Sequence, residues 1–114
     1  MKTLILAFGL ALIAGSAHAD AIAPGQAQAH VGQVVTVEGT VSDVFATRSG
    51  VTFLDIGGSY PNNSFAVVIF KDDANKFPDA DSLSGKTIDV TGAIRLFRGK
   101  PEIVLSDPGQ LKTK

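Results

Sequence analysis

Apolar and polar residues alternate along five runs of the chain between Gln33 and Asp107. The runs are QVVTVEGTVSDVFA, VTFLDIG, FAVVIF, KTIDVTGAIRLF and PEIVLSD. In the first run one face carries Val35, Val37, Gly39 and Val41, and the other face carries Thr36, Glu38, Thr40 and Ser42. Alternation with a period of two predicts strands that bury one side. The third run is nearly all apolar, which is typical of a short buried strand.

The connections between the runs predict the turns of the fold. Residues 47–50 and 98–101 are short, polar and contain glycine, so both predict tight hairpins. Residues 57–64 form a longer loop rich in turn residues. Only the connection 71–85 is long enough for a helix. Asp72 would cap that helix, and Pro78 would end it at Phe77.

Two glycines in the middle of strands suggest where the sheet must curve. Gly39 interrupts the first run and Gly92 the fourth, and glycine inside a strand weakens it unless the backbone bends or packs closely there. The first strand of an OB-fold is long and curved because it pairs in both halves of the barrel. We therefore predict an all-β protein over residues 33–111. It would be a five-stranded OB-fold Greek-key barrel with a short helix between strands 3 and 4.

The same pattern predicts the barrel core. Phe77 and Leu83 would plug its open end from the helix-bearing connection. Ile103 and Leu105 would point inward from the fifth run. The apolar face of the fourth run comprises Ile88, Val90, Ile94 and Leu96.

The chain begins with a segment that resembles a cleavable signal peptide, MKTLILAFGLALIAGSAHAD. Lys2 precedes an apolar stretch, and Ala17-His18-Ala19 fits a cleavage site after Ala19. We expect residues 1–19 to be removed and the protein to be periplasmic or secreted, with no membrane insertion afterwards. The alternative is an N-terminal anchor or a buried helix. Residues 20–32 are either a flexible leader or a short helix beginning at Pro24, and residues 112–114 form a tail.

Composition narrows the chemistry. The absence of cysteine excludes disulfides, lipidation after the signal and thiolate-held metals. The formal charge is −1 for the chain, and without Lys2 it is 9 basic minus 11 acidic residues, or −2. Proteins that depend on non-specific phosphate contacts usually carry a basic excess. The charges are unevenly placed, however, and such segregation can steer an anionic ligand.

The helix-bearing connection contains a group of four aspartates that could suggest a calcium site. Its members are Asp72, Asp73, Asp79 and Asp81. The later ligands and the glutamate of an EF-hand loop are missing, so we expect a helix cap and a solvated acidic loop. We predict neither a metal nor a cofactor.

Catalysis is not expected either. His30 is the one histidine after the signal segment, and no nucleophile–histidine–carboxylate arrangement can be assembled around it. A metal-dependent nuclease on this fold needs clustered carboxylates. Here only Glu38 and Asp55 lie on the early strands, without a second acidic cluster to join them. We therefore expect no enzyme.

Three cations and three aromatic residues suggest a binding face. Arg48 lies in the loop between the first two strands, and Arg98 and Lys100 lie in the loop between the last two. In an OB barrel these loops flank one face, so we expect the cations to converge there. The aromatic residues beside them are Phe53, Tyr60 and Phe97. Aromatic faces and cations are what single-strand binding uses. The alternative is that these residues are ordinary surface aromatics and solvated charges.

Three stretches carry a family resemblance: VTVEGTVSDV, GVTFLDIGGSYPNNSF and GKTIDVTGAIRLFRGKPEIVLSDPGQL. Together they resemble nucleic-acid-binding OB-fold domains of the tRNA-anticodon and helicase-associated type, especially small exported bacterial proteins that carry only this domain. The resemblance spans about residues 31–111. It implies that the second and third strands form a face for single-stranded nucleic acid or another anionic polymer. The alternative partner is a periplasmic protein held by the same face, with no nucleic-acid role. We expect a monomer.

Overall fold

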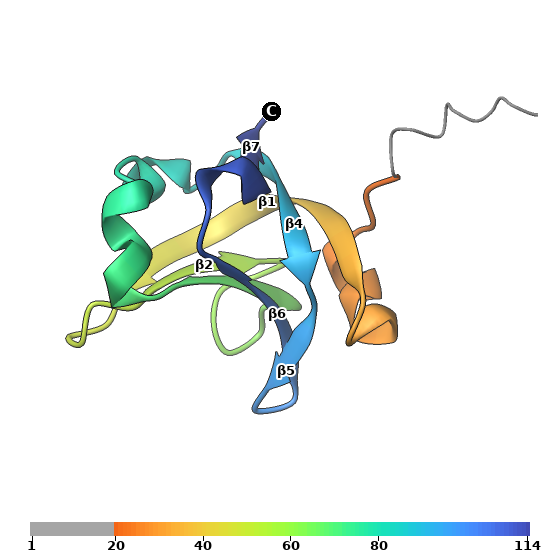
Figure 1. Ribbon diagram of the computed structural model, residues 1–114. Helices are drawn as coiled ribbons and strands as arrows, with labels where there is room; N and C mark the ends of the chain where they lie inside the picture. Colours follow the sequence, from red (N-terminus) through yellow and green to blue (C-terminus); the bar gives the residue numbers. More distant parts are fainter. Residues whose placement is uncertain (1–19) are drawn as a thin grey trace, which may run out of the picture.

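The computed structural model describes residues 20–114, so the expected signal peptide lies outside the described residues. Figure 1 shows a strongly curved sheet with short helical segments at its periphery. The sheet has seven strands in the order β5-β6-β3-β2-β1-β4-β7. The strands are β1 (Val34–Ala46), β2 (Thr52–Ile56), β3 (Phe65–Ile69), β4 (Thr87–Ala93), β5 (Arg95–Phe97), β6 (Lys100–Leu105) and β7 (Leu111–Thr113).

Strand β1 pairs in both halves of the barrel, as the OB-fold prediction requires. Its first half lies antiparallel to β4 and its second half antiparallel to β2. A register irregularity between Val41 and Asp43 marks the change of partner. Strands β3 and β6 pair in parallel. The sheet closes where β4 approaches β6: a Cβ atom on Gly92 would lie only 2.7 Å from Cγ2 of Ile103. The predicted all-β OB barrel is confirmed.

The structure has seven strands where five were predicted. The fourth run is divided into two strands, and the C-terminal residues pair with β4 as an additional strand. Ile94 leaves the ladder, and its backbone exchanges hydrogen bonds with Gly32 and Gln33. Strand β5 therefore starts afresh as one arm of a projecting hairpin. Leu96, predicted to be buried, is 46% exposed because this arm extends beyond the barrel. Residues 111–113 add β7 against β4.

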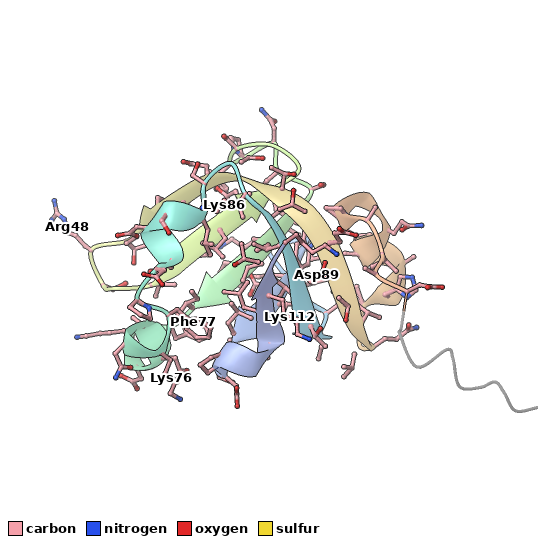
Figure 2. All side chains as sticks on the ribbon, turned by 90° about the horizontal axis from the view of Figure 1, so that it is seen from above. Arg48, Lys76, Phe77, Lys86, Asp89 and Lys112 are labelled. Atoms are coloured by element: carbon pink, nitrogen blue, oxygen red, sulfur yellow. The ribbon has the colours of Figure 1, made fainter. Side chains whose placement is uncertain are left out.

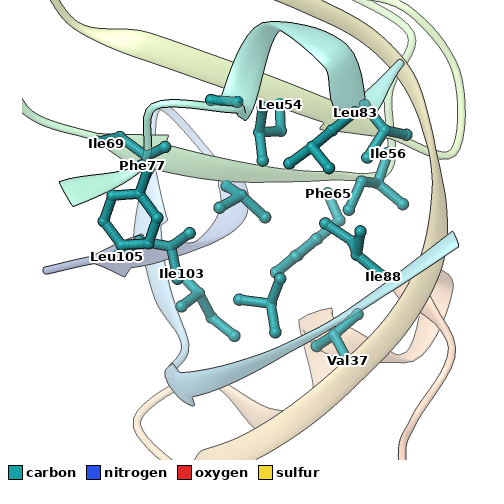
Figure 3. Packing of buried hydrophobic residues seen from close by; sticks show 14 of the residues in the cluster. Val37, Leu54, Ile56, Phe65, Ile69, Phe77, Leu83, Ile88, Ile103 and Leu105 are labelled. Carbon is teal, nitrogen blue, oxygen red and sulfur yellow. The ribbon is translucent and has the colours of Figure 1, made fainter. Parts of the chain in front are cut away.

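The connection between β3 and β4 holds two short 3-10 segments, η3 (Lys71–Lys76) and η4 (Ala80–Leu83). Asp72 lies inside the first turn of η3 and does not cap it, because the capping position is Phe70. The segment ends at Lys76 with Phe77 as its C-cap, within one residue of the end predicted from Pro78. Figure 3 shows Phe77 and Leu83 within the apolar cluster, where both are buried. These residues fill the end of the barrel, as expected from the sequence.

Residues 24–30 form a third 3-10 segment, η2 (Pro24–His30), which packs on the barrel through the fully buried Ala27. The chain before it joins β1 through a bridge between Ile22 and Val37. A Cβ atom on Gly39 would lie 2.7 Å from Cγ of Pro24, which explains why glycine is needed there. Another short segment, η5 (Pro108–Gln110), precedes β7. Within residues 20–114 no helix has the length and apolarity needed to span a membrane.

Candidate functional site

A pocket of about 270 Å³ opens on the face of β2 and β3. Its walls come from the end of β1, strands β2, β3 and β6, the loop 57–64, and the hairpin between β5 and β6. The lining residues are Phe45, Phe53, Asp55, Tyr60, Pro61, Asn63, Ala66, Phe97, Arg98, Lys100 and Glu102. The size is slightly below that of sites for drug-sized ligands, which begin at about 300 Å³.

Four of the residues that line the pocket are aromatic: Phe45, Phe53, Tyr60 and Phe97. Phe45 and Phe53 are directly opposite each other on β1 and β2, and their rings stack with centroids 5.2 Å apart and planes inclined by 19°. Tyr60 and Phe97 are 64% and 48% exposed. Large apolar rings left this open to water are available to stack against a planar ligand.

The hairpin between β5 and β6 places Arg98 at the rim. Phe97 pairs with Lys100 across the hairpin, which leaves a loop of two residues. Arg98 and Gly99 have φ angles of 54° and 80°. Positive φ at both positions defines a type I′ turn. The guanidinium of Arg98 lies 5.1 Å from the ring centroid of Phe97, within cation–π range.

Lys100 holds the neighbouring loop in place. Its Nζ donates hydrogen bonds to the carbonyl oxygens of Pro61, at 3.0 Å, and of Asn63, at 2.9 Å. These bonds fix the loop 57–64, which carries Tyr60, against β6. Much of the hydrogen-bonding capacity of this ammonium is therefore used inside the protein, and less remains for a ligand.

The pocket floor is polar and buried. Asp55 and Asn63 are 2% and 3% exposed, and Nδ2 of Asn63 donates to Oδ1 of Asp55 at 3.3 Å. Burial raises the pKa of the Asp55 carboxyl, and the negative charge of Asp43 adds to the rise. The nearby Tyr60 backbone amide and the charge of Lys100 act in the opposite direction.

Glu102 is the second buried carboxylate of the pocket, and it is neutralised by an arginine. Its Oε2 accepts from Nε of Arg95 at 2.7 Å, and Nη2 of Arg95 lies at the same distance. The Arg95 guanidinium also lies over the ring of Phe70, 5.7 Å from its centroid. Arg95 is therefore a structural partner of Glu102 and does not line the pocket.

The structure gathers five of the six residues predicted to form the binding face. Phe53, Tyr60, Phe97, Arg98 and Lys100 all line the pocket. Their role in binding stays a prediction.

Arg48 is not brought to this pocket. Figure 2 shows it projecting from the tip of its hairpin. That hairpin lies against the start of η3, because a Cβ atom on Gly50 would be 3.1 Å from the Lys71 side chain. The three cations predicted to converge therefore do not all face the pocket.

The acidic connection shows one ion pair, between Asp73 and Lys76 at 2.9 Å. Across residues 20–114, no group of three potential metal-ligating side chains comes together. The four aspartates of the connection thus offer no metal centre among the described residues.

Sequence reasoning missed six of the pocket residues: Phe45, Asp55, Pro61, Asn63, Ala66 and Glu102. Alternation placed Asp55 on the outward side of its strand, and outward polar residues are normally solvated. The sequence did contain one indication that Asp55 is buried, because this carboxylate lies inside the short apolar run FLDIG. The burial of Asn63 depends on how the loop 57–64 folds over β2 and β3, which alternation does not reveal.

Comparison of the sequence with models of known protein families and with curated proteins gives no match. Solved structures do match the fold. An aspartyl tRNA synthetase from Entamoeba histolytica superposes with a TM-score of 0.60 at 11% identity, over 96% of this chain and 24% of the synthetase. A putative aspartyl-tRNA synthetase from Leishmania major Friedlin gives 0.57 at 11% identity, over 94% and 23%. The chain thus spans about a quarter of these proteins, and the likeness establishes the fold.

Proposed function

We propose that this protein is an exported OB-fold module that binds single-stranded nucleic acid, or another anionic polymer bearing planar groups. The observation that carries the proposal is the aromatic pocket on β2 and β3. Stacked Phe45 and Phe53, with Tyr60 and Phe97, offer planar apolar surface beside the guanidinium of Arg98. The proposed role is binding, without catalysis, and export rests on the signal-like residues 1–19.

The balance of forces favours stacking over phosphate contacts. Stacking on aromatic side chains contributes roughly 1–3 kcal/mol per base. The electrostatic contribution to the binding free energy should be smaller than three converging cations would give. Lys100 is held by carbonyl oxygens, and Arg48 lies away from the pocket. For one to two phosphates neutralised, log K should fall with log salt with a slope of roughly −0.7 to −1.4. We expect micromolar or weaker affinity.

Two considerations support a nucleic acid as the ligand. The sequence resembles nucleic-acid-binding OB-fold domains, and that resemblance implies a binding face on the second and third strands, where the pocket lies. Two solved structures of similar fold are aspartyl-tRNA synthetases, one of them putative, and their names place tRNA among the substrates of those proteins. OB-folds in general bind oligonucleotides on this face, between two flanking loops.

The proposal is tested by fluorescence anisotropy with a labelled oligothymidylate of about 8 nucleotides, within the site size of an OB-fold. Phe53→Ala should weaken binding at low salt, whereas Val34→Ala should not. Val34 is the matched control, because it is a 73% exposed apolar side chain that does not line the pocket. Absence of binding at low salt, or equal loss in the two variants, contradicts the proposal. Salt-insensitive capture of a periplasmic protein instead would favour the alternative partner.

A further inference from the structure

The aromatic side chains that lie outside the core gather on one face of the sheet. Seven phenylalanine and tyrosine residues fall within residues 20–114, and two of them, Phe65 and Phe77, are buried in the core. Four of the other five line the pocket on β2 and β3. The fifth, Phe70, is 40% exposed and does not line the pocket. Contiguous apolar surface that is open to water marks a site of interaction, so the position of Phe70 relative to the pocket matters.

Phe70 lies on the same side of the sheet as the pocket. It directly follows β3 and keeps an extended backbone, with φ at −74° and ψ at 158°. Ala66, four residues earlier on β3, lines the pocket, and side chains four residues apart along an extended strand point to the same side. At about 3.3 Å per residue, Phe70 lies about 13 Å further along this face than Ala66.

An arginine covers the Phe70 ring and keeps donors in reserve. The guanidinium of Arg95 lies 5.7 Å from the ring centroid of Phe70, within cation–π range. Nε and Nη2 of Arg95 contact Oε2 of Glu102, and the Arg95 side chain is 49% exposed. A guanidinium carries five N–H donors, so the contact with Glu102 leaves others for a ligand. Phe70 and Arg95 thus present a planar, cationic surface to water.

The hairpin between β5 and β6 has the same arrangement at the other end of this face, where the guanidinium of Arg98 lies over Phe97. Phe97 is two residues from Arg95 along β5, and Arg95 is level with Ala66 across β6 and β3. Phe70 is four residues beyond Ala66. Two plus four residues separate Phe97 from Phe70 along the strands, which corresponds to about 20 Å between their backbone positions.

We infer that Phe70 and Arg95 form an outer subsite for the same single-stranded chain that the pocket binds. The inference rests on the proposed function. Phe53 pairs with Val68, two residues before Phe70, so it lies between the two ends of the face. One continuous strand therefore meets Phe97, Phe53 and Phe70 in turn. At the spacing of about 3.4 Å per nucleotide in a stacked strand, 20 Å corresponds to about 6 nucleotides, within the site size of an OB-fold.

The outer subsite supplies two contacts to this strand. A base stacks on the Phe70 ring or on the guanidinium plane of Arg95, since both are used as stacking surfaces for unpaired bases. The remaining N–H donors of Arg95 bond a neighbouring phosphate, which is a charge-assisted contact. The pocket alone holds a short oligonucleotide, and the outer subsite adds affinity only for a chain long enough to reach it.

The test compares labelled oligothymidylates of three, six and eight nucleotides by fluorescence anisotropy at low salt. The unaltered protein should bind the two longer chains similarly, and both at least about 10-fold more tightly than the trinucleotide, because only they reach both ends of the face. Affinity that is already complete with the trinucleotide overturns the inference and leaves the proposed function standing. If even the octanucleotide fails to bind, the proposed function itself fails.

A pair of variants assigns the gain in affinity to the outer subsite. Phe70→Ala should weaken binding of the hexanucleotide by about 5-fold or more, the lower bound for one stacked base, and leave the trinucleotide unaffected. Leu96→Ala is the matched control, because Leu96 is 46% exposed and lies between Arg95 and Phe97 on β5, with its side chain on the opposite side of the strand. It should change neither affinity. Equal weakening of both oligonucleotides by Phe70→Ala, or the same loss in both variants, overturns the inference.

Amide chemical shifts locate the outer subsite in the unaltered protein, so poor folding of a variant does not weaken the test. In addition to the pocket residues, the hexanucleotide should perturb the amides of Phe70 and Arg95, and the trinucleotide should leave Phe70 unperturbed. An unperturbed Phe70 amide in the protein saturated with the hexanucleotide overturns the inference.

Discussion

Replacing Arg98 by asparagine should separate binding from folding. Arg98 has a φ of 54° in a two-residue turn followed by Gly99. The left-handed region costs most residues about 1–2 kcal/mol, and asparagine before glycine is the favoured pair for a type I′ turn. The substitution also removes the cation–π contact with Phe97, which contributes about 0.5–1 kcal/mol at an exposed site. The gain and the loss should cancel to within about 1 kcal/mol.

The fold should therefore tolerate Arg98→Asn while ligand binding weakens. The unfolding midpoint should shift by less than about 8 °C, the upper shift for 1 kcal/mol in a domain of this size. In anisotropy titrations at several salt concentrations, the slope of log K against log salt should lose about 0.7, the share of one phosphate contact on a single strand. Lys86→Gln removes the same charge away from the pocket and should keep the slope. An unchanged slope in Arg98→Asn would refute the assignment of Arg98 to the ligand face.

Three further substitutions test the pocket. Phe53→Ala should weaken oligonucleotide binding by about 1–3 kcal/mol in anisotropy titrations, and unchanged affinity would exclude stacking on this ring. For Asp55, a folded-state pKa above the ordinary value makes its ionised form destabilising, so this penalty is absent below pH 3.8 and complete above the raised pKa. Asp55→Asn should therefore gain stability relative to the unaltered protein in urea unfolding as the pH rises; a gain at low pH instead would contradict this sign. Lys100→Met should speed hydrogen exchange in the loop 57–64, because the bonds to Pro61 and Asn63 are lost, and unchanged exchange would show that Lys100 does not hold the loop.

The barrel was predictable because the pattern that specifies each strand lies within a short stretch of the sequence. Alternation along each run fixes which residues face inward, and Leu54, Ile88, Ile103 and Leu105 are all fully buried. The same reasoning failed for Leu96, because alternation continues through Ile94 while the backbone leaves the ladder there. Alternation with a period of two shows which side of a strand a residue faces. It does not show where the strand leaves the barrel, and beyond that point both sides of the strand are exposed to water.

The pocket was predictable only in part. Phe53, Phe97 and Arg98 could be assigned to one face from strand order and loop position. Arg48 lies in a loop that the OB topology places beside the binding face, but its side chain does not reach the pocket. The direction of this hairpin depends on its packing against η3, which the sequence pattern does not reveal. The polar floor also depends on tertiary structure, since Asp55 becomes buried only when the loop 57–64 closes over it.

The most direct test of the central claim is a titration of the isotope-labelled protein with a short single-stranded oligonucleotide, followed by amide chemical shifts. The account predicts perturbations concentrated in residues 53–63 and 95–102, with Lys86 and Lys112 unaffected. Shifts confined to η3 and η4, or no shifts at low salt, would contradict a nucleic-acid site in the aromatic pocket.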